Sequence, residues 1–144
     1  MDKQALIEQL KIILGSAFSF YLKAQNYHWN VTGPNFAQYH DFFGELYEEV
    51  YESVDAIAEE IRKHNEFAPG SLARFSELSV IDDEVNIPET TQMFKRLAND
   101  NLLILNEYYK ARKVAEEIGA YGTVNFIEDR ISVHEKHQWM LNSF

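Results

Sequence analysis

Four side chains in the first half of the chain are of types that bind transition metals: His28, His40, Asp55 and Glu59. Imidazole nitrogens and carboxylate oxygens make a mixed ligand set that suits iron, manganese or zinc. If His40 and Asp55 lie on one helix, their separation in sequence corresponds to about 22 Å along the helix axis. The first coordination shell of a metal has a radius of only roughly 2 Å. Either the four residues are unrelated, or a second copy of the chain completes the site.

The elements that must position these residues are helices. Apolar residues recur at steps of three and four from Leu6 to His28, which predicts a helix with His28 at its end on the buried face. A break at residues 32–34 follows, because glycine and proline interrupt helices. The second predicted helix ends near His64 and has a heptad seam that His40 interrupts. The seam consists of Phe36, His40, Phe43, Tyr47, Val50, Val54, Ile57 and Ile61.

The second half of the chain has the same helical periodicity. A third helix is predicted to begin between residues 88 and 91 and to stop at Gly119, and a fourth to follow with Thr123 as its N-cap. The connection over residues 65–87 is long enough to run the length of the molecule, and Ser71 within it begins a short extra helix. We therefore expect an all-α, ferritin-like four-helix bundle with one long crossover, formed as a single domain by residues 1–144.

Such bundles often carry a di-iron site inside one chain, built from Glu-x-x-His pairs on two helices. The five histidines here have no glutamate three positions before them; those positions hold Gln25, Ala37, Ile61, Ile131 and His134. A site between chains is the alternative. If the second helix packs antiparallel against its own copy, with the twofold axis near the midpoint of His40 and Asp55, then His40 lies beside the partner's Asp55. Glu59, one turn further, lies on the same side, and His28 could reach the same place.

The composition of the chain limits the classes of binding partner that we expect. The formal charge of −10 repels the phosphate backbone of nucleic acids and attracts cations. The chain has no cysteine, which excludes disulfides and thiolate zinc sites. Its beginning has neither a basic segment nor an apolar run that we expect to act as a signal or a membrane span. We therefore expect a cytoplasmic protein that makes no membrane contact.

Several stretches of the sequence resemble one family. Residues 28–36 read His-Trp-Asn-Val-Thr-Gly-Pro-Asn-Phe, His40 follows, and residues 55–59 read Asp-Ala-Ile-Ala-Glu. With residues 68–71 and 134–141, these stretches resemble the Dps family of mini-ferritins over essentially the whole chain. The resemblance implies a hollow homo-dodecamer that binds iron at sites shared across twofold interfaces. It also implies ferroxidase activity, in which ferrous iron is oxidised, usually by hydrogen peroxide, and ferric mineral is stored inside to protect the cell from oxidative damage.

Carried over residue by residue, the resemblance makes His28 and His40 of one subunit, with Asp55 and Glu59 of the other, both the catalytic residues and the ligands of iron. Zinc or manganese could occupy the same site. Where the family carries a carboxylate four residues after the second histidine, this chain has Gly44. We therefore predict one firmly bound iron and a loose second one, with oxidation that is slow or needs peroxide.

Two other functions remain open at this point. One is a structural shell whose site is degenerate because of Gly44, and the other is a nucleoid-type protein that binds DNA. Family members that bind DNA through a terminus generally use a lysine-rich tail, but here only Lys3 precedes the first helix, so we expect no direct DNA binding. Among the other histidines, we interpret His64 as a helix cap, and we favour a core or interface role over metal binding for His134 and His137.

Overall fold

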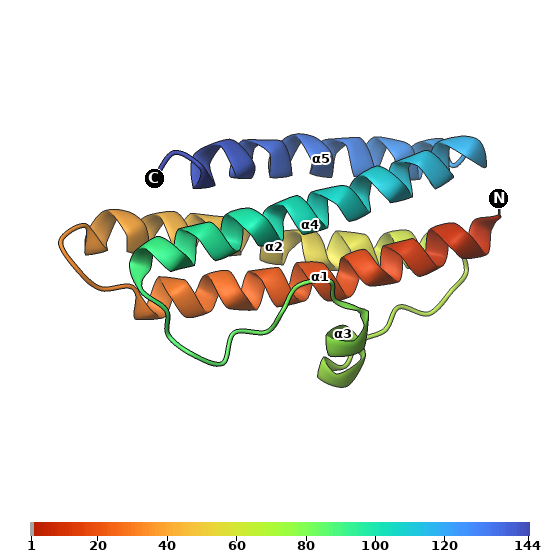
Figure 1. Ribbon diagram of the computed structural model, residues 1–144. Helices are drawn as coiled ribbons and strands as arrows, with labels where there is room; N and C mark the ends of the chain where they lie inside the picture. The colour runs from red at the N-terminus through yellow and green to blue at the C-terminus, as the bar shows by residue number, and fades with distance from the viewer. Residues whose placement is uncertain (1) are drawn as a thin grey trace.

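The computed structural model describes residues 2–144, in which all regular structure is helical. The helices are α1 (Lys3–Asn30), α2 (Phe36–Lys63), α3 (Leu72–Leu78), α4 (Thr90–Glu117) and α5 (Tyr121–Leu141). Figure 1 shows two antiparallel hairpins, α1 with α2 and α4 with α5, joined by a crossover that carries α3. The ferritin-like bundle with a short extra helix is therefore confirmed.

The apolar seam predicted for α2 is only partly buried. Phe43, Val50 and Ile57, seven residues apart, are fully buried, whereas Phe36 is 44% exposed and Tyr47 is only partly buried. A straight α-helix drifts by about 20° per heptad, so one seam cannot face the core along the whole of a long helix. The predicted seam therefore faces the core over only part of its length. Of the other members, Ile61 is also buried and Val54 is partly buried, whereas Phe36 stacks on His40 with centroids 5.1 Å apart.

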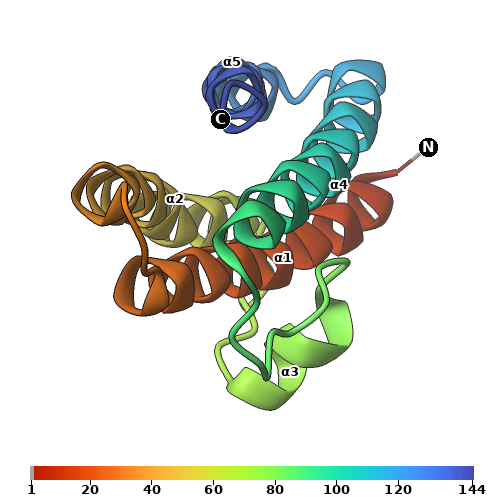
Figure 2. The same ribbon diagram turned by 60° about the vertical axis from the view of Figure 1, so that its left-hand side comes forward.

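The short helix α3 docks on α1 through a close backbone approach. A Cβ atom added at Gly15 would lie 3.0 Å from the Leu78 Cβ and from the Phe75 carbonyl oxygen. Ser16 next to it accepts a hydrogen bond from the main-chain nitrogen of Val80 at 3.0 Å. These contacts hold the crossover on the side of α1 that faces away from α5 (Figure 2).

The start of α5 differs from the prediction. This helix begins at Tyr121, so Thr123 is not its N-cap but a buried residue inside it. The Thr123 hydroxyl donates to Glu60 at 3.0 Å, and His64 donates to the Thr123 oxygen at 2.9 Å. His64 is the C-cap of α2, as predicted, but partial burial and the charge of Lys3 lower its pKa. The ring is thus neutral at pH 7, and it connects α2 to α5 instead of adding charge at the helix end.

A buried ion pair joins α1 to α4. The Lys23 ammonium lies 2.9 Å from the Asp100 carboxylate, and each side chain is less than 10% exposed. The same ammonium donates to the main-chain carbonyl of Asp82 in the crossover at 3.0 Å. Burial raises the pKa of Asp100 despite the nearby ammonium. One lysine therefore holds two helices and the crossover together.

Helix α1 is more apolar than we expected from the sequence. By length and composition alone it could cross a membrane, and 50% of its most apolar window is buried inside the bundle. Packing against the other helices accounts for this apolar character.

Candidate metal centre

The short turn between α1 and α2 brings His28 and His40 into direct contact. Their rings stack with centroids 3.8 Å apart and planes 16° from parallel. The Nδ1 atom of His28 lies 2.6 Å from the His40 carbonyl oxygen, and the Nδ1 atom of His40 lies 2.6 Å from the His28 carbonyl oxygen. The two histidines thus fix each other through a reciprocal pair of hydrogen bonds.

These two hydrogen bonds determine which nitrogen of each ring carries a proton. A carbonyl oxygen can only accept, so each Nδ1 must carry a proton, and in a neutral ring Nε2 is then the nitrogen with the free lone pair. Proteins orient metal-binding histidines in the same way, by a hydrogen bond from the nitrogen that does not bind the metal. Two imidazoles, each with Nε2 as the nitrogen that can bind a metal, therefore lie side by side at one end of the bundle.

The predicted carboxylates lie elsewhere on α2. Asp55 and Glu59 are both exposed and one turn apart, further along the helix that carries His40. Among residues 2–144 no group of three or more histidine, aspartate or glutamate side chains could hold a metal. The structure thus brings His28 and His40 together but not the carboxylates, and one chain presents two separate halves of the predicted ligand set.

Gly44 lies directly under the His28 ring. A Cβ atom at position 44 would be 3.0 Å from both Cε1 and Nδ1 of His28. Such a distance is tighter than most real Cβ contacts, so a side chain there would require the ring to shift by a few tenths of an ångström. In this chain the imidazole therefore occupies the space above α2 that a carboxylate at position 44 would need.

The centre of the bundle contains an ion-paired network. Arg130 of α5 makes two hydrogen bonds to the carboxylate of Glu49 on α2, and His137 donates to the same carboxylate at 2.7 Å. His134 is fully buried; its Nδ1 donates to Asn101 of α4 at 2.7 Å, and its Nε2 accepts from Arg130 at 3.1 Å. Sequence reasoning missed Glu49 and Arg130, because their pairing joins positions that are far apart in the chain.

Neighbouring groups determine the pKa values of Glu49 and His134 in this network. Burial opposes ionisation of Glu49, but hydrogen bonds from His137 and Arg130 outweigh it and lower the pKa of Glu49 to about 2. Burial and the Arg130 charge lower the pKa of His134 well below its usual value. A buried guanidinium repels cations, so the network serves to connect α2, α4 and α5.

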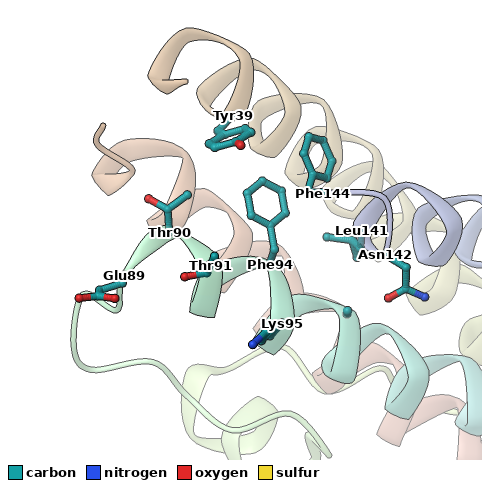
Figure 3. Close-up of a pocket in the computed structure, with 10 residues that line it drawn as sticks. Tyr39, Glu89, Thr90, Thr91, Phe94, Lys95, Leu141, Asn142 and Phe144 are labelled. Carbon is teal, nitrogen blue, oxygen red and sulfur yellow. The ribbon is translucent and has the colours of Figure 1, made fainter. Parts of the chain in front are cut away.

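A cavity of about 580 Å³ lies near the beginnings of α2 and α4 and the end of α5 (Figure 3). Three aromatic rings, those of Tyr39, Phe94 and Phe144, surround it, and Phe94 stacks on Phe144 with centroids 4.3 Å apart. Its ten lining residues include one carboxylate, Glu89, and no histidine. This cavity therefore lacks the ligands of a transition-metal site.

A groove of about 520 Å³ lies beside Asp55, one of the two predicted carboxylates. Asp55 lines it together with mostly apolar residues of α1, α2 and α3 and of the loop before α3, among them Phe18, Tyr51 and Phe75. Tyr51, one of its lining residues, is 53% exposed. An exposed apolar surface of this kind is typical of a contact with another protein surface.

Comparison with known proteins places the chain in a family. A family model described as a ferritin-like domain matches residues 7–144. The DNA protection during starvation protein of Brevibacillus brevis is 33% identical over 124 residues, which cover 86% of this chain and 83% of the relative.

Solved structures agree with this assignment. A Dps protein from Bacillus brevis superposes with a TM-score of 0.94 and 30% identity, covering 100% of this chain and 99% of that chain. The Dps protein of Vibrio cholerae, described as a member of a broad superfamily of ferritin-like diiron-carboxylate proteins, superposes with a TM-score of 0.93 and 26% identity, covering 97% and 88%. The chain belongs to the Dps family of ferritin-like proteins.

Proposed function

We propose that the protein is a ferroxidase and iron store that binds ferrous iron at sites shared between two subunits. The observation that carries this proposal is the reciprocal His28–His40 pair, which holds two Nε2 donors ready on a chain whose predicted carboxylates lie too far away to join them. An antiparallel pairing of α2 with its copy would place Asp55 and Glu59 of each subunit beside the histidines of the other. The exposed apolar groove next to Asp55 supports such a contact.

Each ligand has a distinct part in this proposal. The neutral imidazoles of His28 and His40 would bind the ferrous ion without adding charge. The carboxylates of Asp55 and Glu59 would supply negative charge, which favours the ferric state over the ferrous one. Hydrogen peroxide would be the oxidant, and the ferric product would collect as mineral inside a hollow homo-dodecamer of this single ferritin-like domain in the cytoplasm. Zinc or manganese could occupy the same ligands.

Direct DNA binding is not part of the proposal. Affinity for DNA rises with the number of phosphates that a protein neutralises, and a chain with a net charge of −10 is poorly suited to that. A gel-shift assay at low salt without divalent metal should show no retardation of DNA. Retardation under these conditions would contradict the expectation.

The experiment that tests the function adds ferrous iron and then hydrogen peroxide, and follows the ferric absorbance. The wild type should form a soluble ferric product, whereas His28→Ala and Asp55→Asn should both lose most of the rate. Glu8→Gln removes an exposed carboxylate of α1 and is the control. If the wild type were no faster than His28→Ala, the chain would be a structural shell with a degenerate site, as Gly44 alone could suggest.

A further inference from the structure

Three tyrosines continue from the histidine pair along the α1–α2 face. The Tyr47 ring lies 5.3 Å from the His28 ring, Tyr21 lies 6.0 Å from Tyr47, and Tyr51 lies 4.7 Å from Tyr21, all measured between ring centroids. These spacings are those of aromatic rings in contact. An unbroken row of rings therefore leads from the histidine half of the candidate site to Tyr51.

The row ends at the carboxylate half of the site. Tyr47, Tyr51 and Asp55 follow one another at steps of four on α2, so they lie on one face of the helix. Tyr51 and Asp55 also line the same groove. Within one chain the tyrosines thus connect the two halves of the ligand set, and in the proposed dimer these halves belong to two different sites.

The proposed pairing of α2 gives Tyr51 a specific neighbour. A twofold axis that sets His40 opposite the partner's Asp55 also sets Gly44 opposite the partner's Tyr51, because each of these is four residues nearer the axis. Gly44 has no side chain, and the His28 ring lies on it. The tyrosine row of one subunit would thus end beside the His28 ring of the other, which covers Gly44.

A site that holds a single iron cannot supply both of the electrons that hydrogen peroxide takes up, and a row of tyrosines could supply the second. Hydrogen peroxide takes up two electrons to become water, but a ferrous ion gives only one. Without a carboxylate at position 44, each site of the proposed dimer would hold only one ferrous ion firmly. Its reaction with peroxide and a proton yields ferric ion, water and a hydroxyl radical, which would damage the protein unless a second electron arrived quickly.

We infer that Tyr47, Tyr21 and Tyr51 form an electron-transfer path between the two sites of a dimer, so that one hydrogen peroxide oxidises one ferrous ion in each site. The inference rests on the proposed function. The hydroxyl radical takes a hydrogen atom from a tyrosine of the row, which gives water and a tyrosyl radical. The ferrous ion of the other site then reduces that radical, and a proton restores the phenol. In sum, two ferrous ions, one peroxide and two protons give two ferric ions and two waters.

Phenol chemistry distinguishes this row from ordinary aromatic packing. Phe18 and Phe75 extend the same aromatic cluster, with centroids 5.3 Å from Phe18 to Tyr21 and 4.9 Å from Phe18 to Phe75. Phenylalanine is much harder to oxidise than tyrosine, so radical transfer should stay on the tyrosines. Burial and the nearby Tyr51 hydroxyl raise the pKa of Tyr21. Its phenol is therefore protonated at neutral pH and must release a proton when it is oxidised.

The test compares Tyr21→Phe and Tyr51→Phe with Tyr121→Phe, which changes an exposed tyrosine at the start of α5, outside the row. Each protein is loaded with ferrous iron, mixed with limiting peroxide and frozen for electron paramagnetic resonance. The wild type and Tyr121→Phe should show a transient tyrosyl radical and consume two ferrous ions per peroxide. In Tyr21→Phe and Tyr51→Phe the tyrosyl radical signal should fall severalfold and more hydroxyl radical should be spin-trapped. The number of ferrous ions consumed per peroxide should approach one.

An unchanged radical signal and unchanged iron-to-peroxide ratio in Tyr21→Phe would overturn the inference. So would a radical located only on Trp29, which is 61% exposed next to His28. If His28→Ala still abolished iron oxidation in that case, the proposed function would stand without the tyrosine path. If His28→Ala oxidised iron like the wild type, the proposed function itself would fail and the path would fail with it.

Discussion

Replacing Glu49 should cost more stability than replacing its ion-pair partner Arg130. The Arg130 side chain is 9% exposed and that of Glu49 is 33% exposed. Glu49→Gln would leave the guanidinium buried without an anion, whereas Arg130→Met would leave a carboxylate that water reaches and that His137 still contacts. Removing Glu49 should therefore lower the free energy of unfolding more than removing Arg130.

The magnitudes follow from burial. Breaking a buried pair by removing one partner costs about 3–5 kcal/mol, and we expect about 3 kcal/mol for Glu49→Gln because the glutamine oxygen can still accept one hydrogen bond. For Arg130→Met we expect about 1 kcal/mol, since the remaining carboxylate is partly hydrated. The double variant should regain most of the loss, because no lone charge is left in the bundle. In melting temperature, 1 kcal/mol corresponds to about 3 °C for a chain of this size.

Urea unfolding followed by circular dichroism measures these costs, at one protein concentration because assembly adds stability. The pH dependence is a second check. The pKa of Glu49 is lowered to about 2, so the carboxylate stabilises the fold above its ordinary pKa near 4.5, and this contribution is lost as the pH falls toward 2. The wild type and Glu49→Gln should therefore converge in acid. Equal costs for the two single variants, or additive costs in the double variant, would refute the reasoning.

Three further outcomes are expected. Gly44→Asp should displace the His28 ring, seen as shifted imidazole signals in NMR spectra, and should change the number of ferrous ions bound per subunit; an unchanged ring and iron stoichiometry would remove Gly44 from the account. Lys23→Met should lower stability by about 3 kcal/mol at pH 7 and by less at pH 4, because Asp100 can then protonate. Thr123→Val should cost about 1–2 kcal/mol in urea unfolding, because its partners on α2 lose a buried hydrogen bond.

The fold could be predicted because its signals are local. Helical periodicity, the breaks near Gly33 and Gly119, and the difference between short and long connections determine two hairpins and one crossover. The N-cap of α3, Ser71, could also be predicted, because a serine before an apolar run of helical spacing is a local pattern. Thr123 misled the same reasoning, because its hydroxyl bonds another helix and not its own helix start.

The site could be predicted only in part. Residue types and spacing proposed His28, His40, Asp55 and Glu59 as ligands, of which the structure brings together His28 and His40, and the separation along α2 argued for a second copy. The reciprocal hydrogen bonds of the histidines could not be read from the sequence, because they depend on the exact angle of the turn between α1 and α2. The tyrosine row had a signal that could have been found: Tyr47 and Tyr51 precede Asp55 at steps of four on one helix face.

The central claim is that histidines of one subunit and carboxylates of another form one site, and subunit mixing tests it most directly. One variant lacks both His28 and His40, the other lacks both Asp55 and Glu59, and each alone should oxidise almost no ferrous iron with peroxide. After equimolar unfolding and reassembly, half of the random dimers are mixed and each mixed dimer has one intact site, so about a quarter of the wild-type sites should return. Full inactivity of the reassembled mixture, with native particles formed, would contradict the shared site.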